Sequence, residues 1–123
     1  MKPGDHGSTY GGNPLACMAV KKVLELFEKN HIVEHVKDVS PYLTERLEYL
    51  TEKYDCITER RGKGLIQGIV LKENPADIVN RALEEGLIII TAKGNTIRFV
   101  PPLIIGKEHI DEMIAKLEKA LSA

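Results

Sequence analysis

The sequence lacks the features that mark a membrane, nucleic-acid-binding or secreted protein. It has no apolar run near the ~20 residues that a membrane-spanning helix needs, and its first residues are too polar and glycine-rich for a signal peptide. Its 17 basic and 18 acidic side chains nearly cancel, so no electrostatic reason exists to expect nucleic acid or an anionic membrane as a partner. The two cysteines, Cys17 and Cys56, stand far apart in different predicted elements, which favours a reducing compartment over a disulfide. We therefore expect a cytoplasmic protein.

The remaining composition is that of an ordinary globular domain. With 123 residues, 43% hydrophobic and 28% charged, the chain is long enough for one domain around one core. Its hydrophobic periodicity changes along the chain and predicts the order α, α, β, β, α, β, β, α. No internal repeat or low-complexity tract interrupts this order.

Four segments have the periodicity of amphipathic helices. Asn13 and Pro14 are typical of an N-cap and a first helical position, and Asn74 is an expected N-cap of the third helix. Pro41 lies inside the second segment and should kink that helix or split it in two. The predicted helices cover about 13–30, 32–54, 74–86 and 107–121.

Four further segments have the composition of β-strands. The segment 65–71 is apolar on both faces and is expected to be central, and a turn is expected at 62–64. Gly94 and Asn95 should join the last two strands in an antiparallel hairpin. The expected strands are 56–61, 65–71, 87–91 and 96–100. Together the elements predict an α+β (α/β sandwich) fold, with helices packed on a small, mainly antiparallel sheet.

The segment 4–14, GDHGSTYGGNP, is the least ordinary part of the sequence. Glycines let a backbone turn sharply and present N–H groups, and two adjacent hydroxyls add donors just before a predicted helix. Such a loop suits an anion such as phosphate. It is neither a P-loop nor a dinucleotide-binding fingerprint, because no Gly-Lys-Ser/Thr ending follows it and no strand precedes it. Composition alone leaves a flexible chain end as the alternative.

Residues 3–16, PGDHGSTYGGNPLA, resemble the signature loop of class III aminotransferases, which are fold type I pyridoxal-phosphate enzymes. The resemblance implies a cofactor-phosphate loop at 1–13 and a C-terminal small domain at 14–123. It also implies a homodimer in which the Thr9 hydroxyl contacts the cofactor phosphate of the neighbouring subunit, with Ser8 and Gly7 beside it. The cofactor implied is pyridoxal 5'-phosphate.

Two more segments resemble the same family. Residues 61–69, RGKGLIQGI, are similar to its "RGxGL…G" strand, and residues 96–103, TIRFVPPL, to its "LR…PPL" segment. The second resemblance implies that Arg98 binds a carboxylate of the amino-acid or 2-oxoacid substrate. A guanidinium suits that role because it can bind a carboxylate with two parallel hydrogen bonds, although an arginine on a strand without this context is usually a surface residue.

The pair Asp5-His6 is more similar to acetylornithine aminotransferases than to ornithine aminotransferases, which often have Glu-His there. This likeness implies amino-group transfer between N-acetylornithine and 2-oxoglutarate, in arginine biosynthesis. Tyr10 replaces a phenylalanine frequent in those enzymes, which keeps relatives acting on ornithine, succinylornithine or 4-aminobutyrate open. A non-catalytic dimerisation or anion-binding module is the alternative of another class.

The departures from the family are as informative as the likeness. Family chains are much longer, and their upstream large domain supplies the Schiff-base lysine, which precedes the Gly-rich loop. Only Lys2 precedes the loop here, too close to it to fit, so no catalytic residue is assigned and the isolated chain is expected to be inactive. Exposed apolar surface is expected where a large domain and a partner subunit would sit.

His31 and His35 are spaced i, i+4, a geometry that can bind zinc on a helix. No third ligand is evident, and His6 and His109 have no partner at metal-binding spacing. No metal site is therefore assigned.

Overall fold

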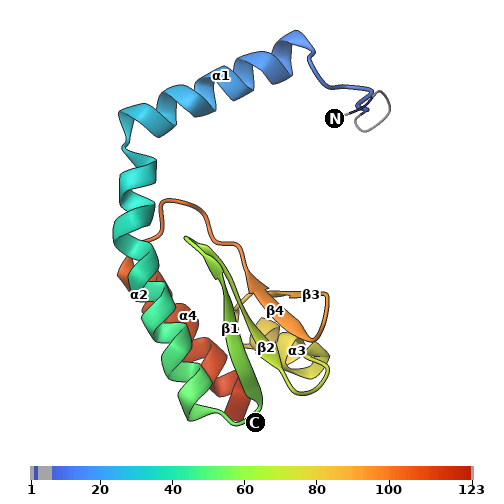
Figure 1. Cartoon of the computed structure of the whole chain (residues 1–123), viewed down its shortest axis with the longest axis vertical. Coiled ribbons are helices and arrows are strands. Elements are labelled where there is room, and N and C mark those ends of the chain that lie inside the picture. Colours follow the sequence, from blue (N-terminus) through green and yellow to red (C-terminus); the bar gives the residue numbers. More distant parts are fainter. Residues whose placement is uncertain (1, 3–6, 123) are drawn as a thin grey trace. The chain divides into compact units, whose positions relative to one another are not determined.

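The computed structural model describes residue 2 and residues 7–122 (Figure 1). Its elements are α1 (Pro14–Lys29), α2 (Ile32–Lys53), β1 (Ile57–Lys63), β2 (Ile66–Leu71), α3 (Ala76–Glu84), β3 (Ile90–Ala92), β4 (Thr96–Phe99) and α4 (Lys107–Ser122). This order confirms the order expected from the periodicity. The chain divides into two compact units, Met1–Val33 and Glu34–Ala123, which are described separately.

The second unit contains a four-stranded sheet in the order β1-β2-β4-β3, with every neighbouring pair antiparallel. The central place of β2 and the antiparallel β3–β4 hairpin are confirmed. Ala92 pairs with Thr96, so Lys93, Gly94 and Asn95 form a three-residue turn, in which Gly94 and Asn95 have φ angles of +75° and +56°. β3 has only three residues, fewer than the five expected.

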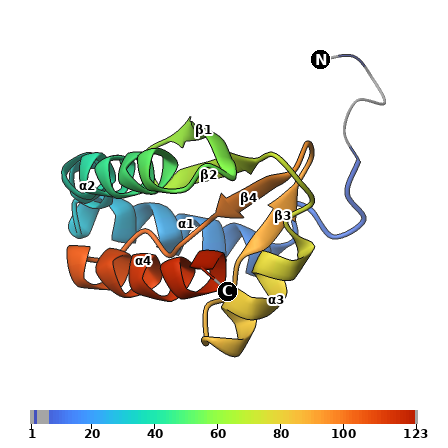
Figure 2. The ribbon, with the colours of Figure 1, turned by 90° about the horizontal axis from the view of Figure 1, so that it is seen from below.

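The core lies between one face of this sheet and the helices of the same unit (Figure 2). β2 and β4 present their alternate side chains to it, and α2 and α4 close it with stripes of aliphatic residues spaced three or four apart. The fully buried large side chains include Leu43, Leu47, Leu50, Ile69, Ile97, Ile110, Ile114 and Leu117. The predicted fold class, an antiparallel sheet with helices packed on it, is confirmed.

Two sequence expectations about the helices can be compared with the structure. Pro41 is expected to kink the second helix or split it in two, and α2 is one helix from Ile32 to Lys53, so the split does not occur. The buried stripe runs on both sides of the proline, from Val39 to Leu50, and its packing offsets the lost backbone hydrogen bond. α3 has Pro75 at the N-cap position, while the Asn74 side chain accepts a hydrogen bond from the Ala76 amide at 3.0 Å.

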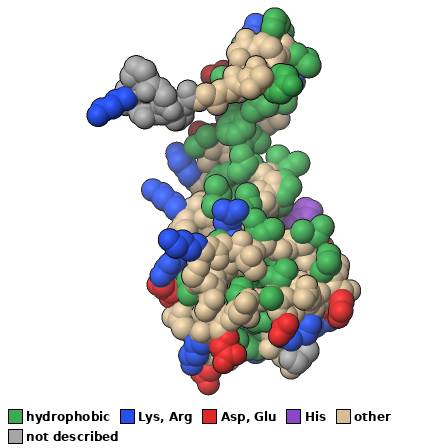
Figure 3. All heavy atoms as spheres, turned by 90° about the vertical axis from the view of Figure 1, so that its right-hand side faces the viewer, with side chains coloured by type: hydrophobic (Ala, Val, Ile, Leu, Met, Phe, Trp, Pro, Cys, Tyr) green, Lys and Arg blue, Asp and Glu red, His purple; other side chains and the backbone are tan. Residues whose placement is uncertain are grey.

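In the first unit, α1 has the expected cap and the expected stripe, but none of its residues is buried. Asn13 Oδ1 accepts from the Ala16 amide at 3.0 Å, and Asn30 ends the helix. Hydrophobic side chains gather along α1 in Figure 3, and at ~100° per residue they cover more than half of its circumference. α1 therefore has exposed apolar surface, and that a large domain or a partner subunit covers it stays a prediction. No helix among the described residues is long and apolar enough to cross a membrane.

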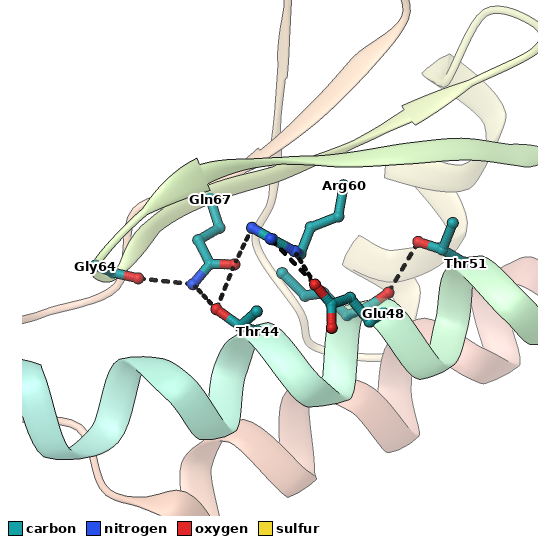
Figure 4. Close-up of polar contacts among 7 residues, drawn as sticks. Thr44, Glu48, Thr51, Arg60, Gly64 and Gln67 are labelled. Carbon is teal, nitrogen blue, oxygen red and sulfur yellow. Dashed lines mark hydrogen bonds and ion pairs between the residues drawn. The ribbon is translucent and has the colours of Figure 1, made fainter.

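Gln67 is the one buried polar side chain among the described residues, with 2% of its surface exposed (Figure 4). Its Nε2 donates to the Gly64 carbonyl at 2.7 Å and to Thr44 Oγ1 at 3.0 Å, and its Oε1 lies 3.4 Å from Arg60 Nη1. Arg60 in turn contacts Glu48 at 3.1 Å. Gln67 bonds both to Gly64 in the β1–β2 turn and to Thr44 in α2, so this network holds the turn against the helix. Both polar atoms of the Gln67 side chain have a partner, as buried polar groups generally do.

Replacing this side chain by Gln67→Leu should lower the free energy of unfolding by about 1–3 kcal/mol, because Gly64 and Thr44 lose a buried partner. Urea titration followed by circular dichroism measures the loss. Thr58→Val is the matched control, since it removes an exposed bond to the Val70 carbonyl on the neighbouring strand. Equal losses in the two variants would contradict a special role for the buried amide.

An exposed ion pair joins α2 to α4 and makes stability depend on pH. Lys53 Nζ lies 2.7 Å from Glu118 Oε1, and Tyr49 donates to the same oxygen at 3.2 Å. The hydrogen bond from Lys53 holds the pKa of Glu118 below its ordinary value, and the same bond raises the pKa of Lys53. As the pH falls below about 4.3, the ordinary glutamate pKa, Glu118 becomes protonated in the unfolded chain while it is still ionised in the folded chain. Acid therefore stabilises the unfolded state, and the contribution of the ion pair to stability is lost.

We therefore expect Glu118→Gln to melt at a lower temperature than the unaltered chain at pH 7, with the difference disappearing as the pH falls through the depressed pKa. Thermal unfolding between pH 7 and pH 3 measures this convergence. Glu52→Gln, which alters an exposed carboxylate of α2, is the control and should show no such convergence. A constant difference across the range would refute the assignment.

Candidate functional site

The residues expected at a phosphate site lie in the loop before α1. Gly7, Ser8 and Thr9 are all exposed, whereas Asp5 and His6, which suggested the subfamily, lie outside the described residues. Ser8 Oγ accepts a hydrogen bond from the Gly11 amide at 2.8 Å, which folds residues 8–11 into a turn. The loop then enters a helix of 16 residues.

The donors of this loop fit a phosphate group. The Thr9 hydroxyl has no hydrogen-bond partner within the described part of the chain, and the Ser8 hydroxyl still has a proton to donate. Both stand near the N-terminus of α1, where free backbone N–H groups and the helix dipole favour negative charge. Gly12 has φ +77°, so the chain enters the helix through a conformation that L side chains rarely adopt.

A groove of about 670 Å³ runs from Gly11 and Gly12 along α1. Beyond the two glycines it follows the apolar stripe past Ala16, Val20 and Leu24. An apolar groove of this kind suits packing against other protein rather than phosphate, which needs hydrogen-bond donors. The groups that fit a phosphate therefore belong to the loop and not to the groove.

Arg98 lies in β4, on the sheet face opposite the core. Its neighbours Ile97 and Phe99 point into the core, and Arg98 is exposed. It pairs with Gly68 of β2 on one side and with Ile90 of β3 on the other. Its guanidinium makes no hydrogen bond or ion pair with the residues that the structure describes, so it is available to an external anion.

The loop and Arg98 belong to different units of the chain, so each is described by itself. The structure does bring Arg61 of β1 into the row of Arg98, through Gly68. The sequence analysis missed this pairing. Alternation marked the sheet faces, but only the register between strands shows which residues are neighbours.

The histidine pair has an ordinary structural environment. His35 Nε2 lies 2.8 Å from the Ile105 carbonyl oxygen, at the end of the β4–α4 connection, and His31 has φ +50° between the first two helices. The described residues contain no group of three or more His, Cys, Asp or Glu side chains placed to hold a metal ion.

Comparison with known proteins gives a consistent result. The family model for class III aminotransferases matches residues 1–121. The chain is 47% identical, over 123 residues, to an acetylornithine aminotransferase of Caldanaerobacter subterraneus subsp. tengcongensis, covering 99% of this chain and 31% of that protein. It is 43% identical to the mitochondrial acetylornithine aminotransferase of Saccharomyces cerevisiae, covering 29% of that protein.

Solved structures agree with these sequences. The crystal structure of acetylornithine aminotransferase from Elizabethkingia anophelis matches with a TM-score of 0.84 and 35% identity, over 99% of this chain and 32% of that one. An ornithine aminotransferase from Plasmodium yoelii matches with a TM-score of 0.85, also at 35% identity, over 99% of this chain and 33% of that one. The chain thus spans about a third of the length of the relatives it matches. It belongs to the class III aminotransferase family.

Proposed function

We propose that this chain is the C-terminal part of an acetylornithine aminotransferase, which exchanges an amino group between N-acetylornithine and 2-oxoglutarate in arginine biosynthesis. The observation that carries the proposal is the 47% identity to a relative of that name, spread over 123 residues rather than confined to one motif. An ornithine-specific enzyme is the second candidate, because a protein of that name is as similar in structure.

The cofactor proposed is pyridoxal 5'-phosphate, which supplies the electron sink for amino-group transfer when bound. Thr9 donates its hydroxyl to the phosphate, while Ser8 and the backbone of Gly7 lie beside it and complete the anion site. The free Thr9 hydroxyl and the nearby N-terminus of α1 support this role. In the proposed homodimer, the phosphate belongs to the cofactor of the partner subunit.

Arg98 is proposed to bind a carboxylate of the amino-acid or 2-oxoacid substrate. Its exposed guanidinium, which has no partner among the described residues, can donate two parallel hydrogen bonds to a carboxylate and so fix the orientation of the substrate. No residue of this chain is proposed to exchange protons with the substrate. The resemblance places the covalent lysine before the Gly-rich loop, so we expect the 123-residue chain alone to show no amino transfer.

A chimera tests the proposal. This chain would replace the matching 31% of the Caldanaerobacter relative, and amino transfer to 2-oxoglutarate would be measured with N-acetylornithine and with ornithine. We expect a folded, active chimera that prefers N-acetylornithine. A preference for ornithine would favour the second candidate, and a folded chimera inactive with both donors would refute both.

The same chimera tests the phosphate loop. Thr9→Val should weaken pyridoxal phosphate binding by about tenfold, the equivalent of one hydrogen bond to a charged group. Equilibrium dialysis of the cofactor measures the change. Thr58→Val, which removes an exposed hydroxyl from β1, is the control and should bind the cofactor normally.

A further inference from the structure

The exposed face of the sheet carries a row of residues that the pairing of the strands fixes. Arg61 of β1 is the partner of Gly68 in β2, and Gly68 is the partner of Arg98 in β4. Ile90 of β3 completes the row. Partners directly opposite each other in antiparallel strands share a face, so both arginines project on the side away from the core.

Gly68 leaves the space between the two arginines open. A Cβ built there would lie 2.7 Å from the Ile97 carbonyl oxygen and 3.1 Å from Thr96 Cγ2, so this position cannot carry a side chain without moving β4. The α-carbons of Arg61 and Arg98 are separated by two strand spacings, about 10 Å. The long side chains of Arg61 and Arg98 can therefore reach the same ligand above Gly68, which has no side chain in the way.

This face of the sheet has two positive charges next to exposed apolar side chains. Among the described residues, Arg98 has no hydrogen-bond or ion-pair partner, and Arg61 pairs only with Glu59, two residues away on its own strand. Ile66 and Ile90 lie on the same face, 60% and 42% exposed. A ligand with a carboxylate at each end and methylene groups between them matches two guanidinium groups beside exposed aliphatic side chains.

We propose that Arg61 is a second carboxylate-binding residue, which acts with Arg98 across Gly68 so that this row of the sheet selects a dicarboxylate over a monocarboxylate. The inference rests on the proposed carboxylate role of Arg98 and adds a second residue to it, because the proposed substrate 2-oxoglutarate has two carboxylates. Glu59 then acts as an internal competitor, because its carboxylate occupies the Arg61 guanidinium when no ligand is bound.

The alternative is that Arg61 forms only a surface ion pair with Glu59. The Arg61 and Glu59 side chains are 62% and 48% exposed, and exposed pairs of this kind contribute little to stability. If Arg61 binds a carboxylate, a dicarboxylate should bind the chain more tightly than a monocarboxylate, and if Arg61 only pairs with Glu59, the two should bind equally. Direct binding to the 123-residue chain therefore distinguishes the alternatives.

Glutarate and pentanoate, which have the same number of carbons and differ by one carboxylate, would be titrated into the ¹⁵N-labelled chain at pH 7 and low ionic strength. Backbone amide shifts at Arg61, Gly68 and Arg98 report binding. We expect glutarate to bind about threefold to tenfold tighter than pentanoate, as one exposed charge-assisted contact allows. Arg61→Gln should bring glutarate to the level of pentanoate, and Glu59→Gln should tighten glutarate binding.

Lys37→Gln and Glu52→Gln are the matched controls, since each changes the net charge by one at an exposed position of α2. They should leave the ratio of the two affinities unchanged. If Arg61→Gln behaves like Lys37→Gln while Arg98→Gln abolishes binding, the inference is wrong and the role of Arg98 stands. If Arg98→Gln changes neither titration, the proposed role of Arg98 is wrong as well, and the inference is overturned with it.

Discussion

Arg98→Lys in the chimera should lower kcat/KM by about tenfold to a hundredfold, while leaving the folded structure intact. Lysine keeps the positive charge but cannot donate two parallel hydrogen bonds to one carboxylate, and a hydrogen bond to a charged group is worth about 1.5–3 kcal/mol. Steady-state kinetics with varied 2-oxoglutarate measure the loss. Thermal unfolding should be unchanged, since the Arg98 side chain is exposed and makes no hydrogen bond or ion pair with the described residues.

Arg60→Lys is the matched control for this experiment. Arg60 is also a strand arginine, but it lies on the α2 side of the sheet, where its guanidinium contacts Glu48 at 3.1 Å. Its substitution should leave the kinetics unaltered. Equal kinetic losses in both variants would indicate a general effect on the domain, and unaltered kinetics in Arg98→Lys would refute carboxylate binding by Arg98.

Most of the fold could be predicted from the sequence because its elements have strong local signals. Gly94-Asn95 predicted the hairpin turn, since both residue types tolerate the positive φ that they have here. The length of β3 could not be predicted in the same way. The Leu87 amide donates to the Ala82 carbonyl at 2.8 Å, so Leu87 closes the C-terminus of α3 and the strand begins only at Ile90.

The burial of α1 is a different case. Its periodicity predicts an amphipathic helix, which is confirmed together with the cap at Asn13. Periodicity shows which face is apolar but not whether anything covers it, because burial depends on the polypeptide packed against that face. None of the α1 residues is buried by the described part of this chain.

In the candidate site, too, the part formed by neighbouring residues in the sequence could be predicted, and the part formed by strand pairing could not. The loop around Ser8 and Thr9 is contiguous, so its donors could be identified from the sequence alone. The neighbourhood of Arg98 is built by pairing between strands, and no local signal places Arg61 opposite Gly68. The register depends in part on where the β1–β2 turn falls, and the sequence placed that turn at 62–64.

The structure instead extends β1 to Lys63, which pairs with Ile66 and leaves Gly64 and Leu65 as a two-residue turn. Gly64 has φ +61°, as the first central residue of a type II′ turn requires. Gly62 is therefore a strand residue, paired with Gln67, and not part of the turn. Its φ of +111° gives that strand a local irregularity that only glycine tolerates readily.

Gly62→Ala should lower the free energy of unfolding by about 2–4 kcal/mol, because it combines backbone strain with a steric clash. A Cβ at this position would lie 2.3 Å from the Ile66 carbonyl oxygen and 2.6 Å from Gln67 Cα, both backbone atoms of the partner strand. Relieving the clash would displace Gln67, whose side chain fastens the turn to α2. Urea titration measures the loss.

Gly94→Ala separates the two contributions. Gly94 also has a positive φ, +75°, but a Cβ there would meet no atom within 4 Å. It should cost about 1 kcal/mol, the strain of a left-handed conformation alone. The excess loss in Gly62→Ala then measures the clash between β1 and β2, and equal losses in the two variants would show that the strands can separate at Gly62 without cost. A larger loss in Gly62→Ala than in Gly94→Ala would also show that the register of β1, and so the position of Arg61 in the row of Arg98, requires glycine at position 62.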